Sequence, residues 1–201
     1  IMPSLVGSEM CIRDSPYFID FRVLYEQGYL TADEIPAEVP VGPVDYGVLY
    51  QQRPVVLQKA ADRLLAAASV EYKDFCTAQS FWLDDYALYM ALKVANGMKN
   101  WVEWDKPYRL RDKKALAAFA AENEEEIGFW KFLQYEFATQ WKKVKDYANA
   151  KGVKILGDIP IYVSADSVDA WVGGELFELD AQGGFARVAG CPPDYFSADG
   201  Q

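Results

Sequence analysis

The sequence contains no histidine among its 201 residues. Nucleophilic catalysis by Ser-His-Asp or Cys-His groups is therefore excluded within this chain, and so are metal sites built on histidine. Any acid–base chemistry here must use Asp, Glu, Lys, Tyr or Cys. Cysteine is scarce as well: Cys11, Cys76 and Cys191 show neither a metal-ligand spacing nor a disulfide framework, which is typical of a reducing compartment.

Positive charge is also in short supply, with 20 Lys and Arg against 30 Asp and Glu. The net charge of -10 argues against nucleic acid as a partner, since phosphate binding uses clustered basic side chains. No apolar run approaches the roughly 18 residues that a membrane span needs, so no membrane association is expected. A hydrophobic share of 51% is enough to build the core of one domain. We therefore expect a folded cytoplasmic protein.

The first residues differ in character from the rest. Ile1–Ser15 has no basic region followed by an apolar one, so it does not read as a secretory signal. It resembles translated adaptor or vector sequence. We expect residues 1–15 to be a non-native leader and residues 16–201 to form the folded part, with an ordinary native N-terminus as the alternative.

Apolar residues repeat at helical spacing in three long segments. These are Val55–Ala68, Phe81–Val94 and Asp112–Ala150, the last interrupted near Glu122. The second half of the longest segment carries one apolar stripe, which predicts a face turned toward a core and consists of Trp130, Leu133, Phe137, Trp141, Val144 and Ala148.

Short signals mark helix ends. Thr31 and Glu34 have the spacing of a capping box, and Gly28, Asn96–Gly97 and Gly152 stand where helices are expected to stop.

Extended segments follow the last long helix. Val153–Leu156 and Ile159–Val163 predict a short buried strand, and a helix, a glycine and then a strand are the parts of a parallel α/β sheet. Phe177–Asp180 and Phe185–Ala189 flank paired glycines and predict a small hairpin.

Two places are candidates for chemistry. Asp158 stands at the end of the predicted strand, where ligands bind in parallel sheets and barrels, although it equally suits a structural role at the strand end. The loop Pro192–Ser197 presents Tyr195 and Phe196, whose rings suit the apolar faces of sugars. The alternative is that these aromatic side chains fold back into the core.

Other pairs of side chains favour structural roles. Asp84 and Asp85 diverge by about 100° on a helix and cannot face one substrate together, so they are expected in its first turn, beside the positive end of the helix dipole. Trp101 and Trp104 suit either a sugar platform or core packing, and core packing is the commoner use of such residues.

These signals combine in a series of longer motifs. In chain order they read PYFIDF, WLDDYALYMALK, QWKKVKDYANAKGVKILGD, GDIPIYVSADSVDAW, ELFELDAQG and VAGCPPDYFSADGQ. From Pro16 to Gln201 the chain thereby resembles the 4-α-glucanotransferases of glycoside hydrolase family 77, also named amylomaltase or disproportionating enzyme.

The resemblance implies a fold and an activity. The fold is an α/β (β/α)8 TIM barrel with inserted, mostly helical subdomain segments, here incomplete and truncated on its C-terminal side. The activity transfers a segment of an α-1,4-glucan to the 4-hydroxyl of glucose or another glucan, and the anomeric configuration is retained. The glucan is a maltooligosaccharide, starch or a glycogen dextrin. No organic cofactor and no metal are implied.

The resemblance also implies residue roles. The catalytic carboxylates of the family lie in motifs expected downstream of Gln201, so no catalytic residue is assigned. Substrate-binding roles fall on Asp158, on the loop residues Asp194, Tyr195 and Phe196, on Gln201 near the acceptor, and on Tyr46 at a secondary glucan site. An α-amylase-type hydrolase fragment and a non-catalytic α-glucan-binding module remain the alternatives.

Overall fold

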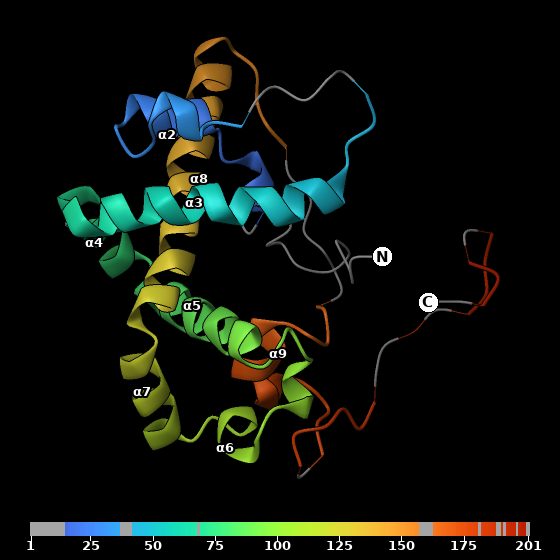
Figure 1. Ribbon diagram of the computed structural model, residues 1–201. Helices are drawn as coiled ribbons and strands as arrows, with labels where there is room; N and C mark the ends of the chain where they lie inside the picture. Colours follow the sequence, from blue (N-terminus) through green and yellow to red (C-terminus); the bar gives the residue numbers. More distant parts are fainter. Residues whose placement is uncertain are drawn as a thin grey trace. The chain divides into compact units, whose positions relative to one another are not determined.

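The computed structural model describes residues 15–36, 42–67, 69–156, 163–180, 182–187, 190, 192–195 and 197–199. The expected leader therefore lies outside the described residues, apart from Ser15. The helices of the described residues follow in chain order in Figure 1: η1 (Pro16–Phe18), α2 (Phe21–Glu26), η2 (Ala32–Glu34), α3 (Tyr46–Ala67), α4 (Val70–Ala78), α5 (Ser80–Ala95), η3 (Trp101–Glu103), α6 (Lys106–Arg109), α7 (Lys113–Glu122), α8 (Glu124–Ala150), α9 (Val168–Val172) and η4 (Gly174–Leu176).

The chain divides into two compact units. The helix unit comprises Glu9–Ala91 and Ala120–Ile159, and the tryptophan unit includes Leu92–Phe119 and Pro160–Gln201. The division falls within helices α5 and α7, and each unit has its own packing. No helix of the described residues combines the length and apolarity that crossing a membrane requires.

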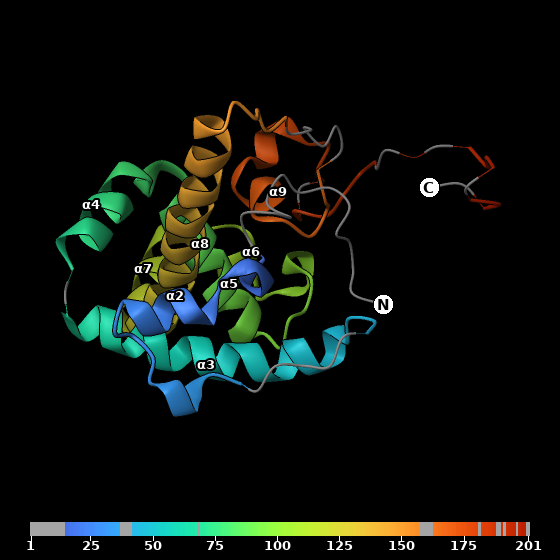
Figure 2. The same cartoon turned by 90° about the horizontal axis from the view of Figure 1, so that it is seen from above.

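The helix unit is organised by the two longest helices. Helix α3 crosses α8 in Figure 1, and Figure 2 shows α4 beside α8 from above. Gly128 of α8 allows the two long helices to approach closely, because a Cβ atom at this position would lie 3.1 Å from a methyl carbon of Leu65. The core between the elements consists of Ile19, Phe21, Leu24, Leu30, Val56, Leu57, Ala60, Ala61, Leu64, Tyr72, Phe129, Phe132, Leu133 and Phe137.

Helix α3 is longer than its sequence predicts. It begins at Tyr46, where the Asp45 carboxylate accepts the Val48 N–H at 3.1 Å, and it continues through Pro54. The predicted start at Val55 is therefore wrong. A proline inside a helix usually marks a boundary because it cannot donate a backbone hydrogen bond. Here the flanking turns stay helical on both sides of it.

Most predicted helix ends are confirmed. The capping box of Thr31 and Glu34 is present at η2. Gly28, Gly97 and Gly152 adopt positive φ angles of 81°, 64° and 78° at the ends of α2, α5 and α8. Glycine suits this left-handed conformation because it has no Cβ atom to clash. The interruption near Glu122 is also found, since α7 ends there and α8 begins at Glu124.

The expectation for the paired carboxylates needs correction. Helix α5 starts at Ser80, so Asp84 and Asp85 lie beyond its first turn. Asp84 instead receives a hydrogen bond from the Lys131 ammonium at 2.5 Å, which joins α5 to α8 inside the helix unit. The earlier start moves both carboxylates away from the helix dipole.

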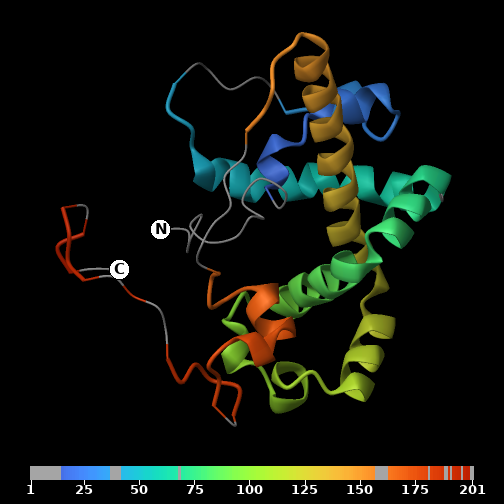
Figure 3. The same cartoon turned by 180° about the vertical axis from the view of Figure 1, so that it is seen from behind.

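The tryptophan unit is built on indole rings. Figure 3 shows α9 next to the turns that carry η3 and α6. Trp171 of α9 donates its indole N–H to the Tyr108 carbonyl at 3.0 Å and meets Trp104 edge-to-face at 5.8 Å. The guanidinium of Arg111 lies 4.2 Å from the Trp171 ring centroid. Together these contacts fix α9 on the α6 turn.

The predicted strand is not found at Val153–Leu156, where the described backbone is neither helix nor strand. Leu156 is 97% exposed. A parallel strand needs a neighbouring strand to complete its ladder, and the described residues contain none beside this segment. The second half of the predicted strand, at residues 159–162, lies outside the described residues. The small hairpin is confirmed as one antiparallel bridge between Leu179 and Phe185.

Candidate functional site

The aromatic loop closes on itself around one carboxylate. The Asp194 N–H donates to the Ser197 carbonyl at 2.9 Å, and the Ser197 N–H donates to Asp194 Oδ1 at 2.8 Å. This reciprocal pair holds a tight turn with Tyr195 at its tip. The Tyr195 side chain is 97% exposed, so the alternative in which it folds back into the core does not hold for this residue.

The remaining predicted binding residues are only partly described. Asp158, Phe196 and Gln201 lie outside the described residues. Tyr46, the first residue of α3, belongs to the helix unit and is 53% exposed. The structure therefore brings Asp194 and Tyr195 together in one turn.

Tyr46 belongs to a small aromatic group. Its ring meets Tyr17 edge-to-face at 6.0 Å, and Tyr50, one helical turn later, is 57% exposed. Burial raises the pKa of Tyr17, and the neighbouring Tyr50 raises it further. The Tyr17 hydroxyl is therefore a neutral hydrogen-bonding group at physiological pH.

The tryptophans Trp101 and Trp104 are core residues in the tryptophan unit, with exposed fractions of 1% and 2%. Their indole N–H groups donate to the carbonyls of Ala165 at 2.8 Å and Lys99 at 3.2 Å. A sugar platform needs an exposed ring face, so that interpretation is wrong for both residues and core packing is correct.

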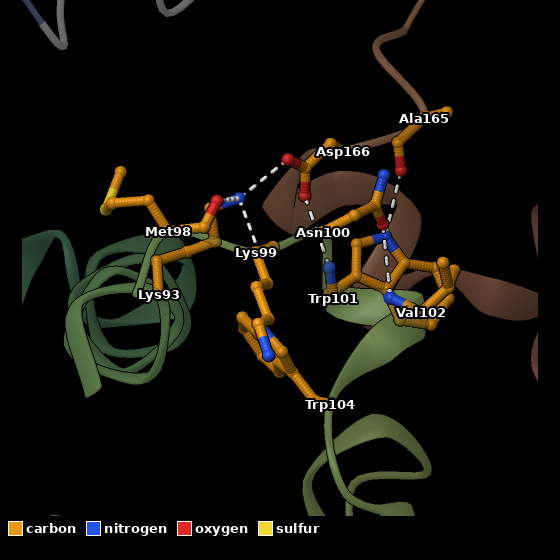
Figure 4. Close-up of polar contacts among 9 residues, drawn as sticks. All are labelled: Lys93, Met98, Lys99, Asn100, Trp101, Val102, Trp104, Ala165 and Asp166. Atoms are coloured by element: carbon orange, nitrogen blue, oxygen red, sulfur yellow. Dashed lines mark hydrogen bonds and ion pairs between the residues drawn. The ribbon is translucent and has the colours of Figure 1, made fainter. Parts of the chain in front are cut away.

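A buried lysine lies beside these tryptophans, as Figure 4 shows. Lys93 is near the end of α5, and its ammonium donates to the carbonyls of Met98 at 3.2 Å and Lys99 at 2.9 Å. Its third contact is Asp166 Oδ2 at 2.6 Å. The other oxygen of Asp166 accepts the Trp101 backbone N–H at 3.3 Å. This group is the Lys93 junction: Lys93, Met98, Lys99, Trp101, Ala165 and Asp166.

The sequence carries a signal for the burial of Lys93 that lies in its helical spacing and not in the motifs. Lys93 follows Tyr86 and Tyr89 at intervals of three and four, on a stripe whose other members are buried. A charged residue on such a stripe indicates a buried partner. Glu136 carries the same signal on α8, among Phe132, Leu133 and Phe137.

Glu136 is fully buried, with no exposed surface. Its Oε2 accepts from the Gln140 amide at 3.3 Å, whereas Oε1 has no partner. Burial raises its pKa to about 7, against the smaller lowering effects of Gln140, Lys143 and Gln27. Because no face of it reaches solvent, this carboxyl is a core group and not a candidate for contacting substrate. No set of three metal-ligating side chains is gathered in the described part of the chain.

Comparison with known proteins places these features in a family. The sequence profile of a family described as "4-alpha-glucanotransferase" matches residues 9–201. The chain is 40% identical over 192 residues to a 4-alpha-glucanotransferase of Clostridium butyricum, covering 93% of this chain and 39% of that protein. It is 42% identical over 191 residues to the Thermus thermophilus enzyme, covering 93% of this chain and 38% of that protein.

A solved structure is similar as well. The amylomaltase from Streptococcus agalactiae in complex with acarbose shares 39% sequence identity, with a TM-score of 0.85 over 92% of this chain and 39% of the other. The chain thus spans about 39% of the length of the proteins it matches. Because the family profile covers nearly all of it, the chain belongs to the 4-alpha-glucanotransferase family.

Proposed function

We propose that the polypeptide containing this chain transfers α-1,4-glucan segments to the 4-hydroxyl of glucose or another glucan. The observation that carries the proposal is the match to 4-alpha-glucanotransferases along residues 9–201. Donors and acceptors are maltooligosaccharides and dextrins of starch or glycogen, and the reaction takes place in the cytoplasm. Residues 16–201 contribute part of a (β/α)8 barrel with helical insertions.

We infer that catalysis and glucan binding fall on different parts of the polypeptide. A retaining double displacement uses one carboxylate as nucleophile and a second carboxyl group as acid and then base, about 5 Å apart. We place both of them beyond Gln201. The present chain then binds and shields the glucan, through Asp158, Asp194, Tyr195, Phe196 and Gln201, without an organic cofactor or metal.

The exposed turn at Tyr195 suits this shielding role. A covalent glycosyl intermediate partitions between a sugar hydroxyl and water, so excluding water favours transfer. Tyr195 offers an open ring to a sugar face, while Asp194 spends one carboxylate oxygen on closing the turn. Asp194 therefore shapes the loop, and Tyr195 touches the glucan.

A second glucan contact is proposed at Tyr46. Tyr46 and Tyr50 are each more than half exposed, and the Tyr46 ring has an edge-to-face contact with Tyr17. Fixed aromatic rings bind apolar faces at low entropic cost. Such a site would hold a long glucan away from the bond being cut.

Incubation with maltotriose tests the proposal. The complete polypeptide is expected to release glucose together with oligosaccharides longer than maltotriose, while the 201-residue chain alone releases none. Glucose and maltose without longer products would instead identify a hydrolase of the α-amylase type. Robust glucose release by the 201-residue chain would overturn the placement of the catalytic carboxylates. Binding of maltoheptaose by a polypeptide without any turnover would identify a glucan-binding module.

A further inference from the structure

We propose that Lys93 is a positioning residue for the aromatic loop, acting through Asp166 and Trp101. The inference rests on the proposed glucan-transfer function. Its structural basis is the Lys93 junction, which joins the end of α5 to the segment between residues 163 and 167 (Figure 4). This segment stands between the two proposed glucan-contacting stretches of the sequence, since Asp158 precedes it and Tyr195 follows it.

The ammonium of Lys93 is fixed in all three of its donor directions. A protonated lysine has three N–H bonds, and here three oxygens accept them: Met98 O, Lys99 O and Asp166 Oδ2. The two carbonyls belong to the turn after α5, in which Gly97 and Met98 have positive φ angles of 64° and 61°. Lys93 therefore ties an unusual turn and the Asp166 carboxylate to a single point.

Stability alone is a weak reason for this arrangement. Lys93 is 94% buried, as its 6% exposed fraction shows, and the Asp166 side chain is only 30% exposed. Removing two charges from water costs about as much as their attraction returns, so apolar replacements of buried pairs are often neutral. The pair does orient Asp166, because its two carboxylate oxygens accept from the Lys93 ammonium and from the Trp101 N–H.

Trp101 connects Asp166 to two further parts of the chain. Its indole donates to the Ala165 carbonyl at 2.8 Å, and its ring meets Phe185 edge-to-face at 5.8 Å. Phe185 is paired with Leu179 across the small hairpin, and the loop at residues 192–195 follows this hairpin in the sequence. A displaced Trp101 would therefore disturb both the segment after Asp158 and the hairpin before Tyr195.

Hydrogen exchange in the 201-residue chain tests the structural half. Lys93→Met is expected to speed amide exchange of Trp101 and residues 163–172 at least tenfold, while amides of α3 and α8 change less than twofold. The matched control is Lys142→Met, which breaks an exposed pair with Asp146 at 2.5 Å on α8. It should leave residues 163–172 unchanged. Exchange within twofold of the wild type in Lys93→Met would overturn the proposal.

The ratio of hydrolysis to transfer in the complete polypeptide tests the functional half. Lys93→Met is expected to raise that ratio about tenfold, as should Tyr195→Ala, because either change admits water. The double variant should be no worse than Tyr195→Ala alone, since both changes act on one loop. Additive effects, or an unchanged ratio in Lys93→Met, would overturn positioning through the loop. A wild type that transfers no glucan would defeat the proposed function, and the exchange measurement would still decide whether Lys93 anchors the segment.

Discussion

Glu136 Oε2 accepts a hydrogen bond from the Gln140 amide at 3.3 Å within a core that leaves Glu136 no contact with solvent. The second oxygen of this carboxyl and the Gln27 side-chain oxygen are both buried without a donor. A proton on Glu136 removes the charge from this buried carboxyl. The nearby titratable groups are Lys143, which favours ionisation, and Tyr29 and Tyr135.

The first prediction concerns pH. The pKa of Glu136 is about 7 in the fold and 4.5 in the reference state. The folded state therefore holds this proton more tightly, so the contribution of Glu136 to stability is greatest below pH 4.5, falls as the pH rises to 7, and is level above. The loss is about 3 kcal/mol at most. Glu136→Gln should remove this dependence in denaturant titrations at pH 5 and pH 8.

No histidine titrates between pH 4.5 and pH 7, because the chain has none. Glu125→Gln, an exposed change on the same helix, is the control and should leave the dependence intact. If the free energy of unfolding changed equally between pH 5 and pH 8 in the wild type and in Glu136→Gln, the result would contradict a neutral buried carboxyl.

The second prediction concerns Arg53. Its guanidinium donates to the carbonyls of Pro16 and Ile19 and lies 4.1 Å from the Phe21 ring centroid. Arg53→Lys keeps the charge but loses the planar fork, so the free energy of unfolding should fall by about 1–3 kcal/mol. Thermal melts provide the measurement. Arg187→Lys, at an exposed pair with Glu178, should have a much smaller effect.

The third prediction compares two positions of α3. Leu64 is fully buried, whereas Val55 is 61% exposed. Leu64→Ala should lower the free energy of unfolding by about 2–5 kcal/mol, because it removes apolar contacts and leaves a cavity. Val55→Ala should change it by less than about 0.5 kcal/mol. Similar effects of the two changes in denaturant titrations would show that α3 buries a different face.

The fourth prediction concerns Tyr195. Tyr195→Ala should weaken maltoheptaose binding by the complete polypeptide about tenfold, or ~1.4 kcal/mol, without changing its melting temperature. Calorimetric titration measures the affinity. Tyr147→Ala, an exposed tyrosine on α8, is the control. Equal losses of maltoheptaose affinity in the two variants would contradict a specific contact between Tyr195 and the glucan.

The contrast between local and distant partners explains what could be predicted from the sequence. The capping box of Thr31 and Glu34 was predictable because both partners lie within three residues. The stripe through Lys93 indicates burial, but Asp166 is 73 residues away and no local rule selects it. The strand at Val153–Leu156 was predicted from apolar character, yet a strand requires a hydrogen-bonding neighbour that the described residues do not provide.

The candidate site divides in the same way. The exposure of Tyr195 follows from a four-residue turn that Asp194 closes, and such turns depend on local sequence. The burial of Trp101 depends on Ala165 and Phe185, which are distant in sequence. The sequence therefore allowed Trp101 to be either a sugar platform or a core residue. Only the tertiary contacts show that it is a core residue.

Labelled glucose as acceptor tests the central claim most directly. The complete polypeptide is incubated with unlabelled maltoheptaose and radiolabelled glucose, and the products are separated by length. Transfer to the 4-hydroxyl of glucose predicts label at the reducing end of maltose and longer oligosaccharides. Label that stays in glucose while maltoheptaose is shortened would contradict glucan transfer and identify hydrolysis instead.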